Sequence, residues 1–126
     1  MIRTLLIVAL GGGIGSALRF AVSHAVQEWT GGMLPWHTLA VNVAGCLLIG
    51  LFYGLADGGR MESDSVKTLL TTGLCGGFTT FSTFCNENVA LARGGHAAAM
   101  LLYTGGSIAL GMAAVAAGYC IAALWR

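Results

Sequence analysis

The sequence carries very little charge. Only 9% of its 126 residues are Asp, Glu, Lys or Arg, whereas about a quarter of the residues in an ordinary soluble domain are charged. So few ionised side chains do not cover a water-exposed surface of this size. The mean hydropathy of +0.80 agrees. Lipid is therefore the expected solvent for most of the chain.

The sequence also lacks the patterns of several other function classes. The charges are scattered and sum to only +1, so no basic stripe is present and nucleic acid is not an expected partner. The four cysteines lie in apolar segments at spacings that match neither a zinc site nor a disulfide framework. We interpret them as packing residues.

We assign no metal or catalytic role to His24, His37 and His96, which lack helix-ligand spacing. With no Walker lysine and no nucleophile–base pair, an enzyme is not expected.

Four apolar stretches are long enough to cross a bilayer core, which takes about 20 residues per helix. They are residues 4–26, 38–56, 66–91 and 97–124, joined by short polar or turn-like connections. The first is longer than a signal-peptide core and three more follow it, so it is expected in the mature protein. The sequence predicts an all-α integral membrane protein with one four-helix domain over residues 1–126.

Glycine is abundant, with 20 residues, which indicates close contact between helices. Three pairs have the GxxxG spacing typical of membrane helix packing: Gly11 with Gly15, Gly50 with Gly54, and Gly73 with Gly77. The glycine-rich run at residues 11–16 superficially resembles a dinucleotide-binding loop, but no βαβ unit surrounds it. Helix packing is the better account.

The third stretch combines three glycines with a following cluster of Thr and Ser near the middle of the membrane. Glycine costs about 1 kcal/mol relative to alanine inside a helix, and a following Thr or Ser can cap a new helix. We therefore predict that the helix breaks within residues 76–80.

A break at that depth frees carbonyls at the end of one half-helix and N–H groups at the start of the next. Carbonyl ends suit a cation and a helix N-terminus suits an anion, so an ion site is one interpretation. The alternative is that the glycines only admit a neighbouring helix while the hydroxyls bond within their own helix. The glycines alone do not separate the two.

Longer motifs favour the ion site over simple helix packing. Residues 73–84, Gly-Leu-Cys-Gly-Gly-Phe-Thr-Thr-Phe-Ser-Thr-Phe, with Glu87 after them, resemble the signature of the Fluc/CrcB family of fluoride channels. Residues 11–19 resemble the family's first-helix motif and residues 38–45 its second, and Tyr103 and Ser107 fall at matching places in the fourth helix. The sequence departs from the pattern only modestly, at Cys85 and Asn86, where a small hydroxyl residue is common.

The resemblance implies a fluoride-selective channel of the bacterial inner membrane that passively exports fluoride and lowers its cytoplasmic level. It also implies an antiparallel, dual-topology homodimer with two pores and a structural sodium ion (Na⁺) at its centre. The sodium ligands would be the backbone carbonyls of Gly76 and Thr79. The fluoride pore would be lined by Asn42, Phe81, Ser82, Thr83, Phe84, Tyr103 and Ser107.

Elementary chemistry permits such a pore, because an aromatic ring has a positive edge and because amide and hydroxyl donors can replace water around an anion. From the residues alone, Asn42 is equally well explained as a hydrogen-bonding link between helices. Tyr103 is more often an interface or packing residue than a ligand. Arg19 lies about 24 Å along a helix from Arg3, near the opposite interface, where snorkelling is the simplest explanation and where it could also raise the local potential for an incoming anion. The role of Glu87 stays open.

Two other function classes remain. A small proton-coupled exporter would need a carboxylate within a span, and Glu87 is the residue that keeps this possibility open. A packing or assembly subunit without transport activity is the second. Flux measurements separate both from a channel.

Overall fold

The computed structural model describes residues 1–125, which are helical almost throughout. The elements are α1 (Ile2–Trp29), α2 (Trp36–Asp57), α3 (Asp64–Thr68), a π-helix η1 (Leu69–Cys75), α4 (Gly76–Phe78), α5 (Phe81–Arg93) and α6 (Ala97–Ala123). The segments α3 to α5 together form the third helix of four. The predicted all-α fold is confirmed, and the helix bounds lie within three residues of the predicted ones.

Within the described residues, three helices are long and apolar enough to cross a membrane by themselves: α1, α2 and α6. The third predicted span is divided, because the chain is extended at Thr79 (ψ 158°) and Thr80 (φ −148°, ψ 113°). The predicted break is therefore confirmed, and it falls at the C-terminal end of the predicted interval. The π-helical turn before it was not predicted.

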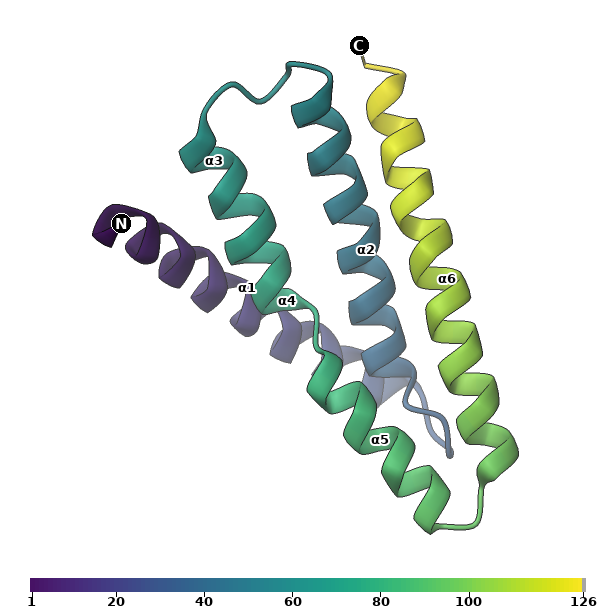
Figure 1. Cartoon of the computed structure of the whole chain (residues 1–126). Coiled ribbons are helices and arrows are strands. Elements are labelled where there is room, and N and C mark those ends of the chain that lie inside the picture. The colour runs from purple at the N-terminus through teal and green to yellow at the C-terminus, as the bar shows by residue number, and fades with distance from the viewer. Residues whose placement is uncertain (126) are drawn as a thin grey trace.

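Helices α2 and α6 run side by side over most of their length (Figure 1). Two glycines make this approach possible. A Cβ atom on Gly50 would collide with the Val115 carbonyl of α6, and one on Gly118 would collide with the Leu47 carbonyl of α2. Backbone thus meets backbone without intervening side chains, as expected for helices that associate by close van der Waals contact in lipid.

Helix α1 crosses behind the third helix in Figure 1 and packs on η1 and α4. A Cβ on Gly11 would lie 2.9 Å from Gly73 Cα, and one on Gly77 would collide with the Gly12 backbone. Glycines of the first and third helices therefore pack on one another. The packing role of the glycines and the helix break occur together, so the two interpretations are not exclusive.

Many large apolar side chains point outward, whereas the buried residues are mostly small, with Phe78, Leu91 and Tyr103 as the large exceptions. Leu6, Phe20, Leu101 and Met112 are among the exposed residues, while the buried set includes Val41, Ala114 and Ala122. A water-soluble protein of this size would not expose so much apolar surface. The arrangement suits a chain surrounded by lipid.

Replacing Gly15 with Ala should destabilise this packing. The new methyl group would lie 2.9 Å from the Phe78 nitrogen and would collide with the Leu74 carbonyl, and such overpacking costs about 1–3 kcal/mol. Gly13→Ala is the matched control, because nothing lies within 4 Å of a Cβ there. Thermal unfolding of both variants in detergent, followed by size exclusion, should show a loss only for Gly15→Ala. Equal melting temperatures would contradict the described contact.

Candidate ion site at the helix break

Asn42 of α2 holds the break in the third helix. Its Oδ1 accepts a hydrogen bond from the Thr80 backbone N–H at 2.8 Å, and its Nδ2 donates to the Thr80 carbonyl at 3.1 Å. One side-chain amide thus satisfies both backbone hydrogen-bonding groups of Thr80, the residue at which the helix is interrupted. Surrounding hydrocarbon could not satisfy them. Because Nδ2 carries two hydrogens, one donor remains for another acceptor.

Hydroxyl groups complete the junction. Thr80 is the N-cap of α5, where its Oγ1 accepts from the Thr83 backbone N–H at 3.3 Å and donates to Thr83 Oγ1 at 2.9 Å. On the other side, Thr79 Oγ1 donates to the Cys75 carbonyl at 2.9 Å. The sequence-predicted capping by Thr is therefore confirmed, and so is the expected back-bonding of a hydroxyl within its own helix.

At the end of the first half-helix, the Gly76 carbonyl loses its usual helical hydrogen bond. In a continuous helix the Thr80 N–H would donate to the Gly76 carbonyl four residues earlier, but here it donates to Asn42. Gly76 lies at an exposed position, and a Cβ there would meet only the Thr71 carbonyl, at 3.9 Å. The backbone around Gly76 is thus open to an external group.

A cavity of about 400 Å³ lies against the break. Its wall includes Asn42, Thr79, Phe81, Phe84 and Ser107. The three aromatic rings nearby form a row, with 6.0 Å between the centroids of Phe81 and Phe84 and 5.1 Å between those of Phe84 and Tyr103. The structure therefore brings together five of the seven predicted pore residues, with the Tyr103 ring tilted against Phe84 and the other four in the cavity wall.

Ser107 is distinctive within this cavity. Its Oγ is buried, and among residues 1–125 it is the one such side-chain N or O atom without a hydrogen-bond partner. A buried hydroxyl without a partner is costly, and it commonly marks a place where a water or an ion binds. The cavity is mostly apolar, with Ser107 and the spare Asn42 hydrogen as donors that can face its contents.

A second cavity, of about 380 Å³, touches the other side of Thr80. It is more polar, and its wall includes Ser16, Arg19, His37, Thr38 and Thr83. Arg19 is half-buried here, so it contributes positive charge to a cavity. Ser82, in contrast, is exposed and lines neither cavity.

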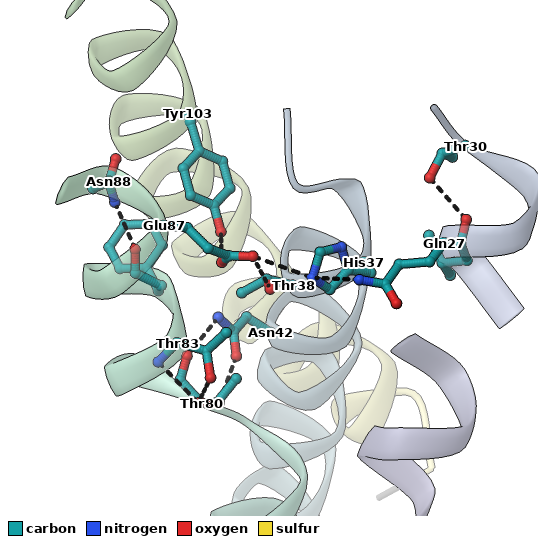
Figure 2. A network of polar contacts seen from close by, with 12 residues as sticks. Gln27, Thr30, His37, Thr38, Asn42, Thr80, Thr83, Glu87, Asn88 and Tyr103 are labelled. Carbon is teal, nitrogen blue, oxygen red and sulfur yellow. Dashed lines mark hydrogen bonds and ion pairs between the residues drawn. The ribbon is translucent and has the colours of Figure 1, made fainter. Parts of the chain in front are cut away.

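Glu87 is the centre of a polar network that links all four helices (Figure 2). Its Oε2 accepts from Thr38 Oγ1 at 2.8 Å, and its Oε1 accepts from the Tyr103 hydroxyl at 3.0 Å. Its Oε2 also lies 3.2 Å from His37 Nε2, which in turn lies 3.3 Å from Gln27 Nε2. The carboxylate, whose role the sequence left open, is thus held by α2 and α6.

Sequence reasoning missed His37, Thr38 and Gln27 as parts of this site. It assigned His37 no role, because histidine near the end of a span is ordinary and no ligand spacing was present. No local pattern reveals the link, since His37 and Glu87 are far apart in the sequence and meet only in the folded chain, where the start of α2 comes close to α5. The one available signal was a carboxylate inside a span, which demands a polar partner.

These features define an integral membrane protein of several apolar helices with two cavities at a helix break. Residues 6–119 match the CrcB-like family, described as "CrcB-like protein, Camphor Resistance (CrcB)". The chain is 42% identical to a protein of Flavobacterium psychrophilum and 46% identical to one of Rhizobium leguminosarum bv. trifolii, each over at least 95% of both chains. A Phocaeicola vulgatus protein is 43% identical over 92% of this chain and 95% of its own. All three are named "Fluoride-specific ion channel FluC". The chain belongs to the CrcB-like family.

Replacing Asn42 with Ala should loosen the break. Two backbone groups of Thr80 would lose their partners, and an unsatisfied buried group costs about 1–3 kcal/mol. Hydrogen exchange of peptides that cover residues 79–84 should therefore speed up by at least about tenfold, which corresponds to about 1.4 kcal/mol. Asn86→Ala, at an exposed position of α5, is the control and should leave the exchange unchanged. Slow exchange in both variants would show that Asn42 does not hold the break.

Proposed function

We propose that the chain forms a fluoride-selective channel that passively exports fluoride across a bacterial inner membrane and lowers its cytoplasmic concentration. Its relatives are named fluoride-specific ion channels over nearly the whole chain. The structural observation that carries the proposal is the buried, unpartnered Ser107 hydroxyl in a cavity walled by Phe81 and Phe84. An anion in this cavity accepts the Ser107 hydrogen bond and meets the ring edges.

The proposed path runs along the row of rings. The positive edges of Phe81 and Phe84 face the anion, while Ser107 and the spare Asn42 hydrogen replace part of its hydration. Tyr103 supports the path through its ring, because its hydroxyl is already bonded to Glu87. Thr83 lines the more polar cavity on the Arg19 side. Ser82 has the weakest support as a pore residue. Because it lines neither cavity of the single subunit, fluoride would reach it only along a path formed with a second subunit.

The functional unit that we propose is an antiparallel homodimer. Phe81 is 76% exposed in the single subunit, and α5 packs chiefly against α6 of its own chain. A second copy in the opposite orientation would cover this face and complete two pores. The same contact would bring two copies of the Gly76 region together at the centre.

A structural sodium ion fits that centre. Gly76 and Thr79 would supply two carbonyls from each subunit, and carbonyl oxygens are suitable ligands for hard cations. The Gly76 carbonyl is without its helical partner, because Thr80 bonds to Asn42 instead. The ion would add positive charge and join the subunits, and no transport step passes through it.

Flux from liposomes tests the channel proposal. Purified protein in fluoride-loaded vesicles should release fluoride when a potassium ionophore balances the charge, and vesicles loaded with chloride should release none. Proton entry that accompanies fluoride release in the presence of the ionophore would instead favour a proton-coupled exporter. Absence of fluoride release, or equal chloride release, would rule out a selective channel.

Phe81→Ile and Phe84→Ile should each reduce fluoride flux by at least about tenfold, which corresponds to about 1.4 kcal/mol of barrier. Isoleucine keeps apolar bulk but removes the ring edge. Phe52→Ile on α2 is the matched control, because Phe52 lies outside both cavities. Size exclusion should give the same elution volume for all three variants. Full flux through both pore variants would place the anion path elsewhere.

Sodium should stabilise the assembled protein. A ligand that binds only the folded state adds about 2.7 kcal/mol at a hundred times its dissociation constant. The melting temperature should therefore rise as Na⁺ replaces N-methyl-D-glucamine at constant ionic strength, whereas K⁺ should give a smaller rise. Identical melting temperatures in all three salts would contradict the structural sodium site and leave the fluoride path untouched.

A further inference from the structure

His37 lies at the start of α2 and faces inward. Its side chain is 21% exposed and that of Glu87 only 16%. The imidazole Nε2 lies 3.2 Å from Glu87 Oε2 on one side and 3.3 Å from Gln27 Nε2 on the other (Figure 2). One ring nitrogen thus stands between a carboxylate, which accepts hydrogen bonds, and an amide nitrogen, which donates them.

The same nitrogen cannot serve both neighbours. Without a hydrogen, Nε2 accepts from Gln27 and presents a lone pair to the carboxylate. With a hydrogen, Nε2 donates to Glu87 and loses its contact with the Gln27 donor. Protonation of a ring whose hydrogen is on Nδ1 therefore exchanges one hydrogen bond for the other, and protonation of either neutral tautomer places a positive charge beside Glu87.

The charge of Glu87 matters for an anion. Both oxygens of its carboxyl group accept hydrogen bonds, one from Thr38 and one from Tyr103. Glu87 is three residues beyond Phe84 on α5, and His37 and Thr38 both line the polar cavity. A lone carboxylate here repels an approaching anion, whereas a carboxylate paired with imidazolium has no net charge.

We propose that His37 is a positioning residue whose protonation neutralises Glu87 and raises fluoride conduction as the pH falls. The inference rests on the proposed channel function and adds regulation by pH to it. His37 itself does not touch the ion. It acts by fixing the charge and the hydrogen bond of the carboxylate beside the path.

The other titratable and charged groups near His37 come from α1 and α6. On α1, Arg19 shares the cavity and brings a guanidinium group to it. On α6, the Tyr103 hydroxyl donates to Glu87 at 3.0 Å. On the outer side of α1, His24 pairs with Glu28 at 3.7 Å, and both are more than 60% exposed. His24 is therefore the neighbouring imidazole that serves as a control.

Fluoride efflux from liposomes should be measured between pH 6 and pH 8.5, with subtraction of the leak from protein-free vesicles. The wild-type rate should rise by at least about threefold from pH 8 to pH 6, where imidazole gains its proton. His37→Gln keeps a donor for Glu87 but does not titrate, so its rate should be flat. His24→Gln should keep the wild-type profile.

Coupling to Glu87 is tested in a double-mutant cycle. In the Glu87→Gln background, His37→Gln should cause no further change in the pH profile. Gln27→Leu leaves His37 in place and removes the donor that competes with Glu87 for Nε2, so the rise in fluoride flux should occur at higher pH. This variant also tests the inference if His37→Gln does not fold. A flat wild-type profile, or an unchanged profile in His37→Gln, would overturn the inference while leaving the channel function intact. Absence of fluoride flux at every pH would instead overturn the proposed function.

Discussion

Backbone hydrogen bonding inside lipid is the constraint on which this structure depends. The third helix stops and restarts at mid-chain, and each N–H or C=O freed there must face protein, water or an ion rather than hydrocarbon. Asn42 supplies both an acceptor and a donor to Thr80. The position of α2 is therefore fixed relative to the break, and the cavity beside the break acquires its wall from these same residues.

The packing of the remaining helices serves this junction. Glycines on α1 and on the third helix allow backbone contact, so α1 supports the first half-helix directly. The second half, α5, is attached differently, through polar contacts to α6: Thr104 Oγ1 donates to Asn88 Oδ1 at 2.8 Å, and Tyr103 donates to Glu87. The first half-helix is thus held by close apolar contacts with α1, whereas α5 is held by polar contacts with α6 in a more open arrangement.

The sequence predicted the helices and the break well, because both follow from local composition. Runs of apolar residues define spans, and glycines followed by Thr80 define where a helix stops and a new one is capped. The π-helical turn at Leu69–Cys75 has no such local signature. The Glu87 network was likewise beyond reach, since it depends on which faces of α1, α2, α5 and α6 meet. Histidine at a span end gave no hint that His37 points inward.

The separation between Asn42 and Thr80, 38 residues, has a consequence for how the protein is made. Ribosomes deliver α2 before the third helix, so the side chain that holds the break is already in the membrane when Thr80 emerges. The interrupted segment therefore never has to wait in lipid for its partner. A permuted chain that began with the third helix would lose this order, and its interrupted segment would enter the bilayer with its backbone unsatisfied.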